Sequence, residues 1–118
     1  MKKEYRIKKN DEIQSLMQKR KTVGNTYFVI YHYKNHDQEH FRYALSVPKK
    51  FGNAVQRNQM KRRIREIIKD CSIIDKVDVF IIAKLKSQEL SFNDIKINIQ
   101  NLLKKAKILK DGKYEKQE

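Results

Sequence analysis

Residues 49–69, KKFGNAVQRNQMKRRIREIIK, form the stretch that decides how this chain folds. At 100° per residue, Met60, Ile64, Ile67 and Ile68 fall on one arc, which predicts a helix with one buried face. A neighbouring arc carries the polar and cationic side chains that we call the cationic stripe: Arg57 at its leading edge, Asn58, Lys61, Arg62, Arg65 and Lys69. The stretch therefore predicts a helix that packs on a core through one side and presents cations on another.

The charges of this stretch indicate an anionic partner. It holds eight Lys or Arg residues and one acid, Glu66, and cations recur at positions 57, 61, 65 and 69. Like charges at this spacing repel one another on a helix, whereas a helix that is merely solvated usually mixes both signs. Guanidinium groups held at fixed spacing suit a sugar–phosphate backbone, and each phosphate contact releases counterions. We therefore interpret the cationic stripe as a nucleic-acid-binding surface.

The composition bounds the class of protein. The 118 residues fit one domain, 1–118, and the net charge of +14 favours a polyanionic partner. Cys71 is the only cysteine, which excludes an internal disulfide and a cysteine-based zinc site and suits a reducing, cytoplasmic setting. No apolar run approaches membrane-spanning length, and no apolar segment follows the charged first residues as in a secretory signal. We therefore expect no membrane partner.

The start of the chain predicts a basic segment followed by a short helix. Residues 1–9 are expected to be extended, and Asn10 is expected to cap the helix. Ile13, Leu16 and Met17 then recur at helical spacing, which suits core packing as well as a binding role.

Two strands are predicted next. Residues 23–25 interrupt the helical pattern, and residues 26–33 and 41–47 alternate as strands do, so we expect them to pair antiparallel. One face of the first strand is rich in tyrosine, which suits stacking on unpaired bases as well as ordinary half-buried packing: Tyr27, Tyr31 and Tyr33.

The second half of the chain predicts a strand and a last helix. Residues 52–53 are expected to turn into a brief extended piece before the basic helix, which should end near Asp70. The continuous apolar run at 77–83 is typical of a buried central strand. Ser91 and Asp94 have the spacing of a capping box for a helix with one apolar face, and residues 111–118 are expected to be a frayed tail.

The predicted fold is a single small α+β domain with about four strands in a mixed sheet packed by helices. Its order is α-β-β-β-α-β-α, in which the third strand is the brief extended piece before the basic helix.

The motifs of this chain resemble those of one known family, the protein subunit of bacterial ribonuclease P. The unbroken spacing i, i+1, i+4, i+5, i+8 in the cationic stripe matches the arginine–asparagine–arginine motif of that family. Residues 52–55 (GNAV) precede the motif as they do in the family, and similar segments extend over roughly the whole chain. They are YRIKKN at 5–10, FVIY at 28–31, LSVPKK at 45–50 and IIAK at 81–84.

The resemblance implies a fold detail and a function. The connection between the strands that flank the basic helix would be left-handed, against the general preference. The chain would be an accessory subunit of an endoribonuclease that cleaves precursor tRNA at its 5′ end. The catalytic groups would lie in the RNA subunit, which would also hold most of the Mg²⁺, with no metal bound tightly by this chain. The partners would be the catalytic RNA and precursor tRNA, with no obligate protein partner.

The resemblance also implies two surfaces. The cationic stripe would dock on the catalytic RNA. A cleft between the first helix and the sheet would hold the single-stranded 5′ leader of the substrate. Its lining positions in this sequence are Ile13, Met17 and Tyr31, with Lys49 and Lys50 near enough to reach its phosphates. The family often has Phe at the positions of Ile13 and Met17, so this chain offers apolar contact there rather than stacking.

No catalytic site is apparent in the sequence. The acids are scattered over caps, loops and helix flanks, no pair has the spacing of a two-metal site, and Glu66 has helical spacing to pair with Arg62 or Arg63. Cys71 is expected to pack at the end of the basic helix. The alternative reading is a ribosomal or other structural RNA-binding protein without a role in catalysis. A protein nuclease and a DNA-binding module are more distant alternatives.

Overall fold

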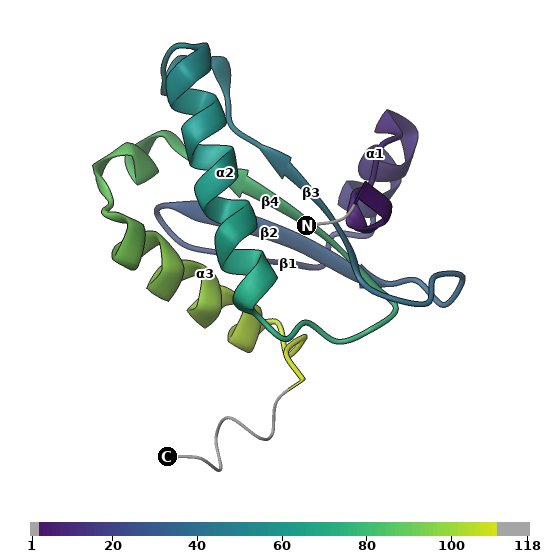
Figure 1. Cartoon of the computed structure of the whole chain (residues 1–118). Coiled ribbons are helices and arrows are strands. Elements are labelled where there is room, and N and C mark those ends of the chain that lie inside the picture. Colours follow the sequence, from purple (N-terminus) through teal and green to yellow (C-terminus); the bar gives the residue numbers. More distant parts are fainter. Residues whose placement is uncertain (1–2, 111–118) are drawn as a thin grey trace, which may run out of the picture.

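The computed structural model describes residues 3–110; the expected tail at 111–118 and the first two residues of the expected N-terminal segment lie outside them. The described chain carries the following helices and strands (Figure 1): α1 (Asn10–Gln18), β1 (Thr22–Gly24), β2 (Phe28–Lys34), β3 (Arg42–Ser46), α2 (Ala54–Asp70), β4 (Val77–Ala83) and α3 (Phe92–Lys105). Three short 3-10 helices join them: η1 (Lys3–Tyr5), η2 (Lys49–Phe51) and η3 (Leu85–Glu89). The α+β class and the order α-β-β-β-α-β-α are confirmed, although the short strand is the first of the three before α2 and not the third.

The strands form one mixed sheet in the order β1-β2-β4-β3. β4 lies in the centre, antiparallel to β2 and parallel to β3, and β1 adds to the far edge of β2. The apolar run at 77–83 thus forms the central strand that its composition predicts.

β3, α2 and β4 form a crossover unit of unusual hand. β3 and β4 are parallel neighbours, and α2 connects them. In Figure 1, α2 lies on the viewer's side of the sheet, and β4 lies to the left of β3 when both strands are turned to point upward. A right-handed connection would place β4 on the right, as in nearly all such units. The left-handed crossover that the resemblance implied is therefore present.

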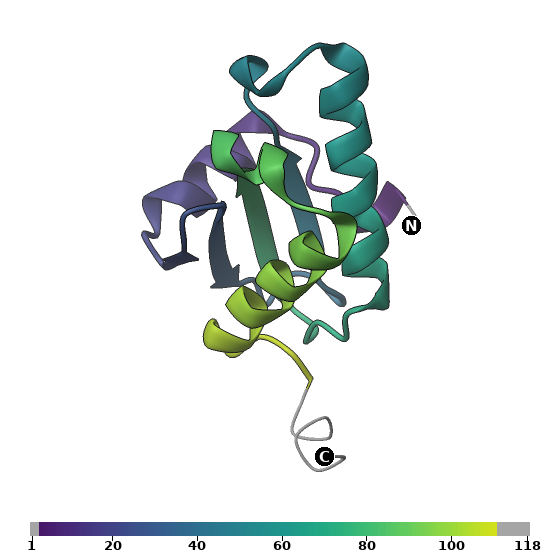
Figure 2. The same cartoon turned by 90° about the vertical axis from the view of Figure 1, so that its left-hand side faces the viewer.

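The sheet separates two apolar clusters. The main core fills the face under α2 and α3, with fully buried side chains such as Phe28, Ile30, Ile64 and Ile99. The smaller cluster lies on the opposite face, where Leu16 of α1 packs with Ile7, Ala44 and Phe80. Figure 2 shows α1 on one side of the sheet and α2 on the other. The two faces therefore belong to different helices, and each can carry its own binding surface.

Three expectations about the strands are wrong. Residues 23–25 do not simply interrupt the chain, because Val23 and Gly24 belong to β1. The strands at 26–33 and 41–47 do not pair, because β4 lies between them. Tyr27 precedes β2 and packs against the main core, away from Tyr31. Only long-range pairing with β4 separates β2 from β3, and the alternation within each strand carries no information about it.

Two expectations about turns are also wrong. The brief extended strand expected after the turn at 52–53 is absent, because α2 begins directly at Ala54, and the short strand of the fold is β1. Asn10 does not cap α1, because the N-cap is Lys9 and no side chain bonds to the first turn there.

The N-terminal segment is only partly extended. Residues 3–5 form the 3-10 helix η1, and Ile7 then donates its N–H to the carbonyl of Tyr43 at 2.8 Å. Ile7 is buried and its neighbours Arg6, Lys8 and Lys9 are exposed, so the segment is anchored while its cations project into solvent.

Candidate nucleic-acid interface

A reciprocal capping box fixes the first turn of α2. The Asn53 side-chain oxygen accepts a hydrogen bond from the Gln56 N–H at 2.9 Å, and the Gln56 side chain accepts one from the Asn53 N–H at 2.9 Å. These bonds satisfy donors that a helix start otherwise leaves without partners. Arg57 Nε donates to the Gly52 carbonyl at 3.2 Å. The leading cation of the stripe is therefore held to the turn that starts the helix.

The rest of α2 is held by burial of the face that its sequence predicts. Met60, Ile64, Ile67 and Ile68 are all buried in the main core. Cys71 caps the other end, where its N–H bonds to the Ile68 carbonyl. The helix is therefore rigid and fixed in rotation, which determines where its cations point.

The cationic stripe lies on the solvent side of α2. Asn58, Arg62 and Lys69 are exposed. The other three members, Arg57, Lys61 and Arg65, are half-buried with their long stems along the helix. Within residues 3–110, no ion pair joins a stripe cation to a carboxylate. Glu66 likewise forms no ion pair with Arg62 or Arg63, contrary to expectation. The cations are therefore uncompensated within the described chain, which leaves them available to an external anion.

The residues expected to line a leader site are brought only partly together. Ile13 and Tyr31 pack on the smaller cluster across from each other, and the Tyr31 and Phe80 rings stack with centroids 6.2 Å apart. Met17 lies one turn beyond Ile13 on α1 and is 36% exposed. Lys49 and Lys50 are exposed on η2, beyond the end of β3 and outside this cluster.

Two rows of the sheet connect these residues. Tyr31, Phe80 and Ala44 are aligned across β2, β4 and β3, and Val29, Ile82 and Ser46 form the next row toward η2. The second row is half-buried rather than buried. A strip of sheet therefore leads from α1 toward the lysines of η2.

Sequence analysis missed the ion network that fastens α1 to the sheet. Arg42 Nη2 lies 3.0 Å from Asp78 Oδ2 and 3.3 Å from Glu12 Oε2, so one guanidinium joins β3, β4 and α1. Arg42 and Asp78 are 11% and 13% exposed, and Asn35 Nδ2 also donates to Asp78 at 3.0 Å. The signal in the sequence was the single acid inside the apolar run at 77–83, because a carboxylate in a central strand requires a partner.

Three groups have pKa values that depart from their usual range. The hydrogen bond to Asp78 is the largest cause that raises the pKa of Arg42, against the opposing effect of burial. Burial, and then nearby Lys21, lowers the pKa of His32. Burial raises the pKa of Cys71 to about 11, with Asp70 adding to the shift. None of these groups belongs to the cationic stripe, and no acid–base pair suited to phosphodiester cleavage accompanies them.

The described residues offer neither a metal cluster nor a membrane-spanning helix. No group of three or more His, Cys, Asp or Glu side chains there is arranged to hold a metal ion. No helix there has the length and apolar character needed to cross a bilayer.

Comparison with known proteins gives a consistent result. A family model described as Ribonuclease P matches residues 1–107. The ribonuclease P protein component of Macrococcus caseolyticus is 45% identical over 108 residues, covering 91% of this chain and 94% of that protein. The protein component of Acholeplasma laidlawii is 46% identical over 111 residues, covering 92% of this chain and 95% of that protein.

Solved structures agree with the sequence relatives. A Staphylococcus aureus RNase P protein mutant with defective mRNA degradation activity superposes with a TM-score of 0.85 at 39% identity, covering 91% of this chain and 92% of that one. The RNase P protein from Thermotoga maritima superposes with a TM-score of 0.77 at 28% identity, covering 85% and 96%. Sequence and fold therefore match the same family over nearly the full length.

Proposed function

Because this chain belongs to the family of ribonuclease P protein components, we propose that its cationic stripe docks on the catalytic RNA of a ribonuclease P ribonucleoprotein. The stripe residues Arg57, Asn58, Lys61, Arg62, Arg65 and Lys69 supply guanidinium, ammonium and amide donors from one rigid element. Phosphate contacts from such groups position a protein on RNA without reading its sequence.

The second part of the proposal concerns the substrate. The single-stranded 5′ leader of precursor tRNA crosses the α1 side of the sheet, where Ile13, Met17 and Tyr31 contact bases and Lys49 and Lys50 contact phosphates. The half-buried strip that leads from Tyr31 to η2 supports this path, as does the exposure of Met17 and both lysines. Stacking of one base is worth about 1–3 kcal/mol, so one or two contacts account for roughly 10- to 100-fold tighter substrate binding.

The chemical step, in this proposal, belongs to the RNA subunit. Mg²⁺ held mainly by that RNA and the substrate supplies a hydrolytic nucleophile and charge stabilisation. The chain contributes by neutralising phosphates and fixing the leader, without binding a metal tightly and without an obligate protein partner. We place the reaction in the cytoplasm, which agrees with the single free thiol.

One observation carries the proposal: a capped helix with a buried face presents cations that no described carboxylate neutralises, in a chain of this family. A ribosomal or other structural RNA-binding protein would share the charge, but no observation favours that alternative.

The test is reconstitution with the cognate catalytic RNA at low Mg²⁺. Arg62→Gln and Arg65→Gln together should weaken binding of the catalytic RNA at least tenfold and leave thermal unfolding unchanged, since neither side chain is ion-paired with a residue in 3–110. Met17→Ala with Lys49→Gln should instead leave RNA assembly intact and weaken binding of precursor tRNA that carries a leader.

A substrate without a leader is the matched control for the second surface. The wild-type protein should increase the affinity for the leader-bearing substrate much more than the affinity for the leaderless one. Equal improvement of both substrates would contradict the leader surface, and normal assembly of the Arg62/Arg65 variant would contradict the docking surface.

A further inference from the structure

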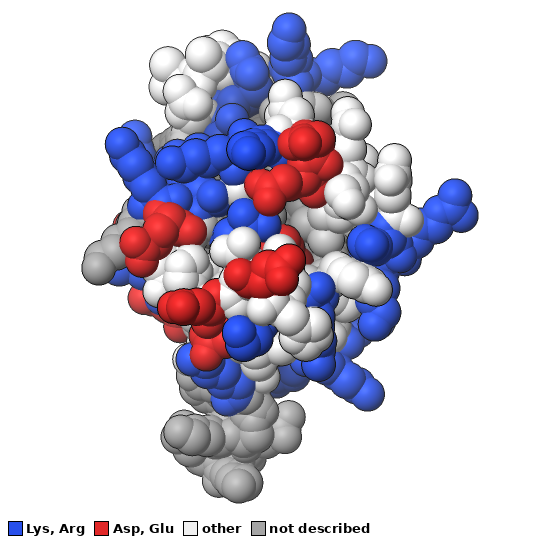
Figure 3. Space-filling model, turned by 90° about the vertical axis from the view of Figure 1, so that its right-hand side faces the viewer, with Lys and Arg blue, Asp and Glu red and all other residues white. Residues whose placement is uncertain are grey.

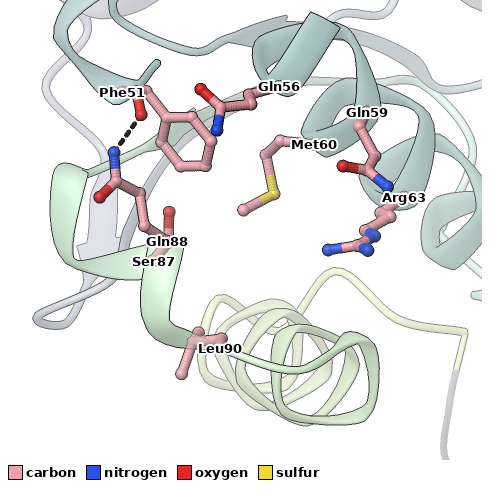
Figure 4. A pocket seen from close by; sticks show the side chains of 8 residues that line it. All are labelled: Phe51, Gln56, Gln59, Met60, Arg63, Ser87, Gln88 and Leu90. Carbon is pink, nitrogen blue, oxygen red and sulfur yellow. Dashed lines mark hydrogen bonds between the residues drawn. The ribbon is translucent and has the colours of Figure 1, made fainter. Parts of the chain in front are cut away.

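A polar pocket lies on the flank of α2 away from the cationic stripe. It has a volume of about 360 Å³ and opens between α2, η2 and the segment from η3 to the start of α3. Figure 4 shows the Met60 side chain at its centre, the Phe51 ring on one side and the Arg63 guanidinium on the other. This volume lies in the range of small-molecule sites and far exceeds what one phosphate group needs.

The lining combines an apolar base with neutral polar groups. Met60 and Phe51 are themselves buried and give the pocket an apolar base, while the amides come from Gln56, Gln59 and Gln88. Arg63 is the only charged side chain among the lining residues, and none of them carries a carboxylate. Amides offer donors and acceptors side by side, which matches the edge of a nucleobase better than an anion.

Only some of these groups are needed to hold the fold. Gln88 Nε2 bonds to the Phe51 carbonyl, and Gln56 is engaged in the capping box of α2. Ser87 Oγ donates to the Lys84 carbonyl. The side chains of Arg63 and Gln59 form no hydrogen bond or ion pair with any described residue. The structural amides therefore shape the pocket, and Arg63 and Gln59 are free to bind something in it.

We propose that this pocket receives one unpaired base of an RNA strand. The base would rest on the apolar surface of Met60 and Phe51, with its edge bonded by Gln59 and its ring stacked on the Arg63 guanidinium. Arg stacks on bases and binds phosphates, and unpaired bases are the usual targets of specific RNA recognition.

The position of the pocket supports an RNA ligand over a free nucleotide. One wall is α2, whose other flank carries the cationic stripe, and another is η2, whose Lys49 and Lys50 are exposed. RNA that engages both of those surfaces comes close to the pocket mouth. The inference rests on the proposed RNA-binding function and adds a base-reading contact to its phosphate contacts.

The test separates bases from phosphates. The ligands are a single-stranded RNA of about ten nucleotides and an abasic chain of the same length and charge. NMR with ¹⁵N-labelled full-length protein follows the Gln59 side-chain amide and the Arg63 Nε–H. Both signals should shift with the RNA and stay in place with the abasic chain, whereas signals of the cationic stripe should respond to both.

Binding by matched variants gives a second readout. Arg63→Gln should weaken binding of the RNA at least threefold and should change the affinity for the abasic chain little. The neighbouring residue Arg62 belongs to the cationic stripe, so Arg62→Gln should weaken binding of both ligands equally. Unchanged thermal unfolding checks that each variant is folded.

Three outcomes would overturn the inference. Equal weakening of both ligands by Arg63→Gln would make Arg63 a phosphate contact only. Equal shifts from adenosine monophosphate at the same concentration would make the pocket a free-nucleotide site. If the protein bound the RNA and the abasic chain equally and the Gln59 signal did not shift, the proposed docking function would stand but the pocket would not be a base-binding site. Failure to bind either chain would overturn the RNA-binding function itself.

Discussion

At the scale of single residues, Arg42 joins three elements of the fold through one guanidinium. Its guanidinium meets carboxylates from β4 and from the first turn of α1, and α1 carries two of the residues proposed to contact the leader. The pair with Asp78 is mostly buried, and its Coulomb attraction and hydrogen bonds offset the cost of removing both charges from water. Arg42 is thus a positioning residue for the α1 side of the sheet.

Replacing Arg42→Met should lower the free energy of unfolding by about 3 kcal/mol, because Asp78 loses its cation while it stays mostly buried. Urea denaturation with an unchanged m-value measures this. The matched control is Lys110→Gln, whose partner Asp75 lies 4.0 Å away with both side chains more than half exposed (54% and 59%). That change should stay within about 0.5 kcal/mol. Equal effects of the two substitutions would show that the network does not hold α1.

Cys71 is predicted to be a poorly reactive thiol. Burial raises its pKa to about 11, so little thiolate is present near neutral pH, and the thiolate is the reactive form. A thiol reagent such as DTNB at pH 8 should react slowly with the folded protein and rapidly after urea is added. Fast reaction of the folded protein would contradict the packed position of Cys71.

The same shift predicts a loss of stability in alkali. The folded thiol holds its proton more tightly than the unfolded thiol, whose pKa is 9.0, so its contribution is complete below about pH 9 and is lost toward pH 11. Cys71→Ala should remove this part of the decline. If the free energy of unfolding fell equally with pH in the two proteins between pH 8 and 11, the prediction would be contradicted.

At the scale of elements, the start of α2 links stability to binding. The capping box satisfies the first turn, and Gly52 leaves room for it because an added Cβ would clash with the Gln56 side-chain oxygen. A side chain at position 52 would displace the glutamine that caps the helix. Arg57 is bonded to the same turn, so the local geometry also sets where the cationic stripe begins.

Asn53→Ala and Asn58→Ala should therefore separate the two roles. Asn53→Ala removes the cap and should lower the free energy of unfolding by about 1 kcal/mol. Asn58 lies in the exposed stripe without a structural hydrogen bond among the described residues, so Asn58→Ala should change stability by less than about 0.5 kcal/mol. Asn58→Ala should instead weaken binding of the catalytic RNA. Chemical denaturation and RNA binding on both variants test the separation, and the reverse pattern would refute it.

At the scale of the whole molecule, the excess positive charge is unevenly distributed. Figure 3 views the side toward which the loop between β2 and β3 extends, and acidic side chains gather in the middle of this face with cations around them. Asp37 and Glu39 belong to that loop, and the cationic stripe lies on α2 instead. A polyanion is attracted less to this face, where acids lie among the cations, than to the cationic stripe, and this difference orients the protein before contact.

Salt dependence should reveal the same asymmetry. The slope of the logarithm of the association constant for the catalytic RNA against the logarithm of the salt concentration should become shallower by about 1 in Arg62→Gln. One phosphate contact and its released counterions are lost in this variant. Lys34→Gln is the matched control, since Lys34 is exposed at the end of β2 beside the loop that bears Asp37 and Glu39. Its slope should match that of the wild type. Equal changes would show that net charge, rather than the stripe, governs binding.

The sequence by itself determined the elements whose pattern is local. The period of Met60, Ile64, Ile67 and Ile68 predicted α2 and its buried face, and its end near Asp70 was predicted too, whereas its start at Ala54 was not. The cations on the neighbouring arc followed from the same period. The apolar run at 77–83 predicted β4 to the residue, and Ser91 was correctly placed as the cap of α3, where its hydroxyl accepts from the Asp94 N–H at 3.1 Å. Such patterns succeed because one face of each element must be buried whatever lies opposite.

Only the tertiary structure decided which elements meet. It placed β4 between β2 and β3, added β1 to the edge, joined Arg42 to Asp78 and Glu12, and opened the pocket beside Arg63. Each of these depends on residues far apart in the chain, whereas periodicity describes only a residue's neighbours within its own element. Strand alternation predicts which face of a strand is buried but not which strand lies beside it. The order of the strands and the contacts between them are therefore set only by long-range pairing during folding.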